Sequence, residues 1–184
     1  MPRPPQGQPL VVALAHSTVP YQFAARGADV AFITPHDAEQ TAAIVAEVRD
    51  AEAAVERTGA PLRILGEIIV FLDDDRAAAE ARRAHLDELN GKAYRSDALI
   101  FTGTASELAD LLLEWSERGL DGYRLRPAAI PHDLDAITRD LVPVLQRRGR
   151  FRHAYGDETL RGRFGLGRPA SRYARAAHSS ASAR

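Results

Sequence analysis

Cysteine is absent from the 184-residue chain, and methionine and tryptophan each occur once. The absence of cysteine excludes disulfide bonds, thiolate metal ligands and a cysteine nucleophile. Six histidines are present, but no two have metal-ligand spacing and no His-Glu-x-x-His motif occurs. We therefore expect no metal centre, and we find no serine in the sequence context of a hydrolase nucleophile.

The sequence also lacks a long hydrophobic run. No stretch approaches the roughly 18 apolar residues of a membrane span, and residues 1–7 have no apolar signal-peptide centre. Hydrophobic residues make up 45% of the chain and charged residues 27%, a mixture that can bury a core. We expect a folded, cytoplasmic protein with no membrane partner, equal to one domain or to one large piece of a bigger domain.

Charge is unevenly distributed along the chain. Residues 147–184 carry ten arginines against Asp157 and Glu158, whereas the formal net charge of the whole chain is only −1. A basic segment can bind nucleic acid, but this one has no series of aromatic residues and no motif for reading bases. The composition favours a solvated or surface-wrapping tail over a nucleic-acid partner.

Short apolar runs alternate with alanine-rich segments. The alternation predicts an α/β fold of βα units, with a parallel sheet and helices packed outside it. Leu108, Leu111, Leu112 and Trp115 have helical spacing and predict one apolar helix face. The expected strands are Leu10–Ala15, Ala28–Thr34, Leu62–Phe71 and Gly122–Arg126, and the expected helices are one near Pro20 and Ala38–Arg57, Arg76–Leu89, Glu107–Arg118 and Asp133–Arg147.

Several boundaries of these elements have recognisable signals. Thr104 and Glu107 have the spacing of a capping box, and Gly119 and Gly149 stand where helices should end in a left-handed residue. Residues 87–97 break the helical pattern and predict an irregular connection. The segment Ala98–Thr102 that follows is either a short fifth strand or an approach to the next helix, and the sequence does not decide between them.

The most informative polar residues are His16, Ser17 and Thr18, which lie between the first predicted strand and the first predicted helix. Two hydroxyl groups, an imidazole and free backbone N–H groups at this position suit a phosphate group. On spacing alone, a simple helix cap at Ser17 or Thr18 is favoured over a ligand site. His36, after the second strand, either faces the same end of the sheet or is an ordinary loop residue.

Two acidic motifs have a structural interpretation. Asp73, Asp74 and Asp75 precede a predicted helix, and three consecutive carboxylates cannot all face one ion, so helix capping is favoured over metal binding. Asp133, next to His132 after the last strand, is expected to be the N-cap of the final helix. The glycines of residues 162–167 do not follow a strand, so they do not form a dinucleotide or P-loop fingerprint.

Several short motifs together resemble the C-terminal half of luciferase-like, flavin-dependent monooxygenases, in particular the branch with nitrilotriacetate and dibenzothiophene-sulfone monooxygenases. Their order and spacing extend over about Pro9 to Ala174. The matching pieces are Phe23–Asp29, Phe101–Thr104 with Glu107–Ala109, Gly119–Tyr123, Leu141–Gly149, Thr159–Arg161, Gly165-Leu166 and Arg168–Tyr173.

The resemblance implies an eight-stranded (β/α) barrel with FMN at the carboxyl ends of its strands, the usual site position in barrel enzymes. It also implies a two-component monooxygenase that acts on a small organic substrate and receives reduced FMN from a separate flavin reductase. Ser17 matches the family's phosphate-binding serine, and His16 stands where the family often has another serine. With Thr18, these residues are the expected cofactor-binding set; no catalytic residue carries over.

The resemblance covers only units five to eight of the barrel. We expect residues 1–150 to form this half-barrel, residues 151–175 to form a basic extension packed on it, and residues 176–184 to be a disordered tail. An isolated half would leave strand edges unpaired. A truncated or split gene product is therefore favoured, with a complementary N-terminal half as partner, over a homo-oligomer in which two copies close a barrel.

Two alternative functions stay open. A half-barrel remnant or subunit could keep the scaffold without catalysis, and the same superfamily includes F420-dependent oxidoreductases. The motif at residues 142–148 favours the FMN branch.

Overall fold

The computed structural model describes residues 3–171 and divides the chain into two compact units. The smaller unit combines Met1–Leu10 with Gly156–Arg184, and in its described part the Arg3 guanidinium donates to the Pro169 carbonyl. It contains the short helix α7 (Leu160–Arg163). That residues 151–175 pack on the barrel stays a prediction, and the tail at residues 176–184 lies outside the described residues.

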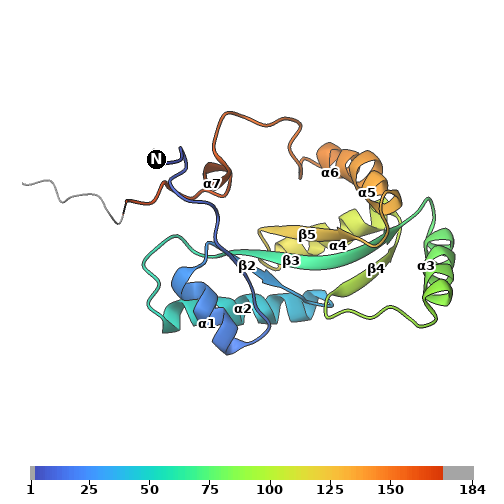
Figure 1. The fold of residues 1–184 in the computed structure, drawn as a ribbon, viewed down its shortest axis with the longest axis horizontal. Helices are drawn as coiled ribbons and strands as arrows, with labels where there is room; N and C mark the ends of the chain where they lie inside the picture. The colour runs from blue at the N-terminus through green and yellow to red at the C-terminus, as the bar shows by residue number, and fades with distance from the viewer. Residues whose placement is uncertain (1–2, 172–184) are drawn as a thin grey trace, which may run out of the picture. The chain divides into compact units, whose positions relative to one another are not determined.

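The larger unit, Val11–Tyr155, contains the sheet (Figure 1). Strands and helices alternate along it, which confirms the α/β prediction. Its elements in chain order are β1 (Val12–Leu14), α1 (Thr18–Gly27), β2 (Val30–Ile33), α2 (Ala38–Ala54), β3 (Arg63–Leu72), α3 (Arg76–Asn90), β4 (Leu99–Gly103), α4 (Ala105–Glu117), β5 (Gly122–Pro127), α5 (His132–Ala136), the π-helix η1 (Ile137–Leu141) and α6 (Val142–Arg147).

The long strand β3 is the centre of a five-stranded, wholly parallel sheet. Its residues 63–66 pair with β2, its residues 68–72 with β4, and its residues 65–70 with β5. Because a strand has only two edges, β2 and β4 follow one another along one edge and β5 takes the other. The open question about Ala98–Thr102 is thereby settled in favour of an additional strand, which is β4 in chain order.

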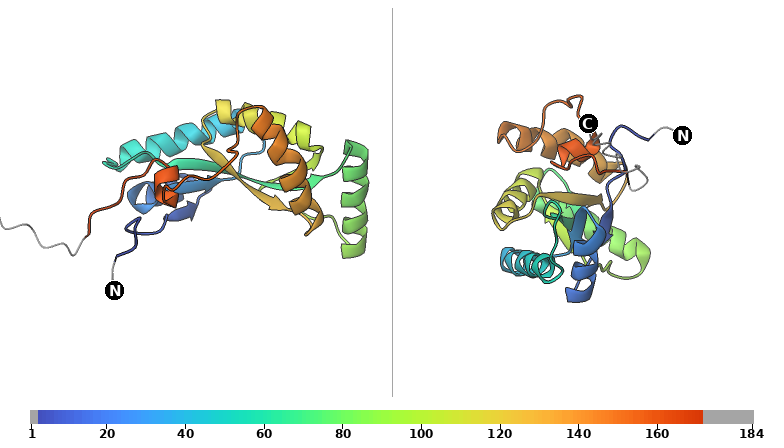
Figure 2. Two further views of the ribbon diagram at one scale, coloured as in Figure 1. Left: turned by 90° about the horizontal axis from the view of Figure 1, so that it is seen from above. Right: turned by 90° about the vertical axis from the view of Figure 1, so that its left-hand side faces the viewer.

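One face of the sheet is covered by a layer of helices. Helices α2 and α4 lie side by side over it (Figure 2), while α3 lies apart from that layer, where β3 and β4 end (Figure 1). The predicted apolar face of α4 packs into the core: Leu108 and Trp115 are at most 1% exposed, and Leu111 is partly buried. Other fully buried members of this core are Tyr21, Ile33, Val48, Ile64, Ile68, Val70, Leu72 and Leu141.

The sequence signals for the ends of helices match the structure. The Thr104 hydroxyl accepts from the Glu107 amide, and the Glu107 carboxylate accepts from the Thr104 amide, so the capping box is confirmed. Gly119 and Gly149 have φ angles of 103° and 67°, the left-handed conformation that glycine adopts without a steric penalty. Within residues 3–171 no helix is long and apolar enough to cross the bilayer.

The last predicted helix is not uniform. Residues 133–147 were expected to form one α-helix, but the structure has a π-helical segment, η1, between α5 and α6. Pro143 explains the change, because it has no N–H to donate back along the helix. The wider turn lies directly before it, where the Val142 amide donates to the Ile137 carbonyl, five residues back.

Candidate functional site

The predicted trio lies at the carboxyl end of β1. Ser17 is the N-cap residue of α1, in extended conformation, yet its hydroxyl makes no capping hydrogen bond. The first amides of a helix have no partner within the helix, so the Ser17 hydroxyl and the amides of Thr18 and Val19 remain available to a ligand. The simple-cap interpretation of the Ser17 side chain is therefore wrong.

His16 joins the ends of two strands and a third segment. Its Nδ1 lies 3.1 Å from the hydroxyl of Thr34, directly after β2, and its Nε2 lies 3.6 Å from a carboxylate oxygen of Asp97. Asp97 belongs to the segment that leads into β4. Because β4 begins opposite Ile68, just beyond the point where β2 ends opposite Gly66, this segment passes the carboxyl end of β2.

The charge of Asp97 is stabilised by its neighbours. Desolvation acts in the opposite direction, but the Ser96 hydroxyl, backbone amides and the His16 ring together hold the pKa of Asp97 below its ordinary value. Both members of the His16–Asp97 pair are open to solvent, with 45% and 62% of their side chains exposed. The pair can therefore be separated at small cost when a ligand binds.

His36 follows β2 and lies at the same end of the sheet as this group. Its backbone amide donates to the Gln40 side chain at 2.6 Å, and no interaction in the described part of the chain joins its imidazole to His16. The acidic run before α3 behaves as a cap, because the Asp75 carboxylate accepts from the Ala78 amide at 2.8 Å. Among the described residues there is no cluster suited to a metal ion.

The prediction for Asp133 is wrong. The N-cap of α5 is Pro131, and Asp133 is fully buried inside the helix. Its carboxylate accepts from the Leu72 and Ala129 amides, both at 2.8 Å, and from both terminal nitrogens of Arg82. The group joins the end of β3 to α3 and α5, an assembly of distant residues that no local sequence signal indicates.

A charged cluster on the sheet was also missed. Glu67, only 4% exposed, lies on β3 opposite β5. Its two oxygens accept from Arg124 at 3.2 Å and from Arg126 at 2.8 Å. The signal was in the sequence, because Arg124 and Arg126 alternate with Leu125 in a strand and Glu67 interrupts an apolar one.

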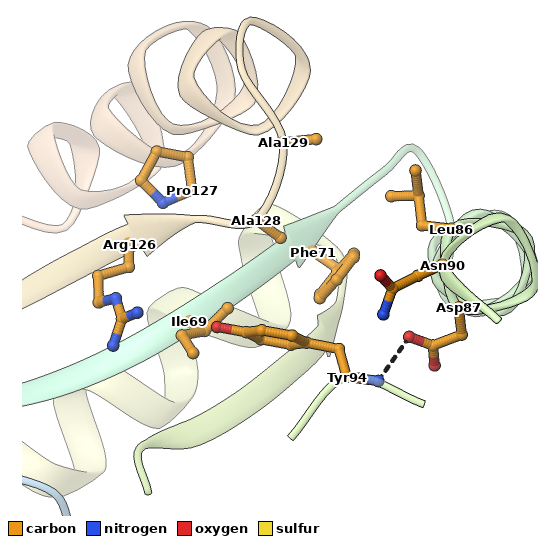
Figure 3. A pocket seen from close by; sticks show the side chains of 10 residues that line it. All are labelled: Ile69, Phe71, Leu86, Asp87, Asn90, Tyr94, Arg126, Pro127, Ala128 and Ala129. Carbon is orange, nitrogen blue, oxygen red and sulfur yellow. Dashed lines mark hydrogen bonds between the residues drawn. The ribbon is translucent and has the colours of Figure 1, made fainter. Parts of the chain in front are cut away.

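Beside this cluster is a pocket of about 320 Å³ (Figure 3). It lies at the carboxyl ends of β3 and β5, where parallel α/β sheets and barrels usually place their ligands. Its wall includes one side of α3 and Tyr94, whose amide donates to Asp87 at 2.8 Å. The lining residues are Ile69, Phe71, Leu86, Asp87, Asn90, Tyr94, Arg126, Pro127, Ala128 and Ala129.

Known proteins of similar sequence include several monooxygenases. N-acetyl-S-(2-succino)cysteine monooxygenase of Bacillus subtilis is 25% identical, over 94% of this chain and 53% of that protein. Nitrilotriacetate monooxygenase component A of Aminobacter aminovorans is 24% identical, over 92% and 51% respectively. The chain thus spans about half the length of the curated relatives it matches.

Solved structures of similar fold also match this chain over about half of their own length. EDTA monooxygenase from Chelativorans sp. BNC1 matches with a TM-score of 0.77 at 22% identity, over 91% of this chain and 51% of that chain. An F420-dependent secondary alcohol dehydrogenase matches less closely, with a TM-score of 0.55 at 11% identity, over 75% and 49% respectively.

The model of the family described as "Luciferase-like monooxygenase" matches residues 1–144, which include β1 to β5 and the candidate site. The chain belongs to the luciferase-like monooxygenase family.

Proposed function

We propose that this chain supplies the C-terminal half of an FMN-dependent, two-component monooxygenase that acts on a small organic molecule. Reduced FMN would come from a separate flavin reductase. The nitrilotriacetate relative is named "component A", which is consistent with a second component in that enzyme. The observation that carries the proposal is the Ser17 hydroxyl, which stands at the start of α1, at the carboxyl end of β1, without a capping partner.

The chemistry of the available donors fits a phosphate group. Ser17 and Thr18 offer hydroxyls, the first amides of α1 point out of the helix end, and His16 adds a cation when it is protonated. Asp97 opposes an anion here, but its contact with His16 is 3.6 Å long and exposed. We expect the phosphate to replace Asp97 as the partner of the imidazole.

In this proposal the chain's residues bind and orient the cofactor. Bound reduced FMN would supply the electrons for oxygen activation. The Ser17 hydroxyl and the Thr18 and Val19 amides would hold the phosphate tail, while Thr34, 3.1 Å from His16 Nδ1, fixes the orientation of the imidazole ring. The donors are backbone or short side chains, so their geometry changes little when a ligand binds.

A comparison of FMN with riboflavin tests the phosphate site. Binding is followed by the quenching of flavin fluorescence. We expect riboflavin, which lacks the phosphate, to bind at least about tenfold more weakly than FMN. Ser17→Ala should weaken FMN binding by about tenfold without loss of stability, because the hydroxyl makes no cap bond. Thr58→Ala, at an exposed threonine in the loop before β3, is the matched control and should change nothing.

Asp97→Asn should act in the opposite direction. Removing this carboxylate frees His16 for the phosphate, and we expect FMN affinity to rise by about two- to fivefold. Equal binding of FMN and riboflavin, unchanged by both substitutions, would contradict the phosphate site. No flavin binding at high micromolar concentration would favour the non-catalytic remnant, and a preference for F420 over FMN would favour the deazaflavin alternative.

The same proposal includes a structural partner. Within the described chain, β1 pairs only with β2 and β5 only with β3, so each leaves one edge open. Val12 and Leu14 are 45% and 49% exposed on the side away from the helices. We expect a complementary N-terminal half to cover these strands, and size-exclusion chromatography with light scattering distinguishes that complex from a homodimer and from a stable monomer.

A further inference from the structure

The pocket beside β3 and β5 has the composition of a small-molecule site. Most of its lining is apolar, with few polar groups, and its 320 Å³ volume is at the lower end of the range for ligand sites. Ile69 and Phe71 form its floor and are themselves buried, at 2% and 4% exposure. A ligand with an apolar body would therefore contact residues that β3 holds rigidly.

Arg126 gives one end of this pocket a positive charge. It shares the buried carboxylate of Glu67 with Arg124, so two guanidinium groups are balanced by a single acid. Only one terminal nitrogen of Arg126 donates to Glu67, while a guanidinium has five N–H donors. Arg126 therefore keeps both unbalanced charge and spare donors, and of the two arginines only Arg126 lines the pocket.

Two more arginines lie beside Phe71 on the pocket floor, and they differ in how their charges are balanced. The guanidinium carbons of Arg82 and Arg83 lie 5.6 Å and 5.8 Å from the centre of the Phe71 ring. Arg82 is neutralised by Asp73 and Asp133. Arg83 donates to the Thr102 hydroxyl at 3.3 Å, and the described residues place no carboxylate within salt-bridge distance of it.

The opposite end of the pocket is formed by α3 and the segment after it. Figure 3 shows Asn90 and Asp87 at this end, far from Arg126, with the Tyr94 ring extending between the two ends. Asp87 is the one acidic lining residue, and one of its oxygens is occupied by the Tyr94 amide. The two ends of the pocket therefore differ in charge.

We propose that this pocket binds a small organic anion with an apolar body: Arg126 receives the anionic group, Asn90 and Tyr94 offer hydrogen bonds, and Ile69 and Phe71 contact the apolar part. The inference deepens the proposed function, on which it rests for the role of this anion as the substrate of the monooxygenase. Tyr94 and Asp97 lie on the same short segment before β4, so the pocket and the His16 site share one wall element.

Three probes of similar shape and different charge test the inference. Phenylacetate, phenylacetamide and phenethylamine are titrated into the chain and followed by amide chemical shifts. We expect phenylacetate to bind at least about tenfold more tightly than the other two and to move the amides of Ile69, Phe71 and Tyr94. Equal binding of the acid and the amide, or a preference for the amine at Asp87, would overturn the assignment.

Arg124 provides a matched control for Arg126. Both are on β5, both pair with Glu67, and only Arg126 lines the pocket. Arg126→Gln should lower phenylacetate affinity by about tenfold or more, Arg126→Lys should keep part of it, and Arg124→Gln should change it by less than about twofold. An equal loss in the two glutamine variants would mean that the effect is structural and would contradict the proposal.

A second variant covers the case in which Arg126→Gln fails to fold. Ala128→Leu adds a side chain at a lining position, while the backbone bond from the Ala128 amide to Val70 is kept. It should abolish phenylacetate binding in a folded protein; unchanged binding would overturn the site. FMN titration of the same sample separates the anion pocket from the proposed flavin site. The protein can bind FMN without binding phenylacetate, and it can bind phenylacetate without binding FMN.

Discussion

The two faces of the sheet in the larger unit differ in the side chains they carry and in the exposure of strand β1. On the helix-covered face, Ile64, Ile68 and Val70 are fully buried in one apolar core. On the other face, the alternate positions of β3 carry Glu67, Ile69 and Phe71, β5 adds two arginines, and β1 exposes its apolar side chains. One face holds the fold together, and the other carries the candidate ligand pocket.

The largest effect should come from removing a side chain on the covered face. Ile68→Ala should lower the free energy of unfolding by about 2–5 kcal/mol, because a fully buried side chain leaves a cavity. Leu14→Ala, on the other face at 49% exposure, should cost less than about 1 kcal/mol. Urea unfolding of both variants measures the difference, and similar losses would remove the distinction between the faces.

The second largest loss of stability should come from a substitution at the buried carboxylate of Asp133. Asp133→Asn removes the charge that pairs with Arg82 and turns one acceptor into a donor, so we expect a loss of about 2–4 kcal/mol. Asp135→Asn is the control on the same helix, because its 3.6 Å pair with Arg139 is exposed and should contribute less than about 0.5 kcal/mol. Thermal unfolding compares the two, and equal shifts would mean that burial of the pair is unimportant.

Two helix starts sharpen the contrast between structural and ligand-binding residues. Thr104→Ala breaks a complete capping box and should cost about 1 kcal/mol of stability. Ser17→Ala removes a hydroxyl that caps nothing and should leave stability within about 0.3 kcal/mol. Chemical unfolding measures both values; a large loss at Ser17 would show that its hydroxyl has a structural role.

Acid should weaken the capping box and the Asp73 contacts. Backbone bonding to Thr104 and the pair with Arg76 lower the pKa of Glu107 against desolvation. Desolvation also opposes the lowered pKa of Asp73, which the Asp74 amide and Arg82 maintain. A carboxylate whose pKa is lower in the folded state stabilises the fold at any pH above its pKa in the unfolded chain, which is near 4.5 for Glu107 and 3.8 for Asp73. This stability is lost as the pH falls through the pKa of the folded state.

Unfolding in urea at pH 7, 4 and 3 measures this loss. Glu107→Gln should reduce stability at pH 7 and flatten the dependence on pH, because the group that titrates is gone. An unchanged pH slope in this variant would assign the acid sensitivity to other carboxylates.

The parts of the fold that depend on local chemistry could be predicted from the sequence. The apolar spacing of α4, the Thr104 capping box and the terminal Gly119 are each set by residues within a few positions of one another. The shared edge of β2 and β4 could not be predicted in this way. It depends on the register of β3 with two strands that are far apart in the sequence.

The candidate sites were only partly predictable, for the same reason. The place of Ser17 after a strand follows from the order of elements, and the family resemblance singled it out. The contact of His16 with Asp97 joins residues 81 positions apart, and the pocket needs β3, α3 and β5 to meet. Burial of Asp133 depends on Arg82, which is 51 positions away.

The most direct test of the account maps flavin binding on the backbone. The chain, labelled with nitrogen-15, is titrated with FMN and separately with riboflavin while amide chemical shifts are recorded. The account predicts that FMN moves the amides of Ser17, Thr18 and Val19 far more than riboflavin does. Equal shifts with the two flavins, or FMN shifts confined to residues away from the carboxyl end of β1, would contradict it.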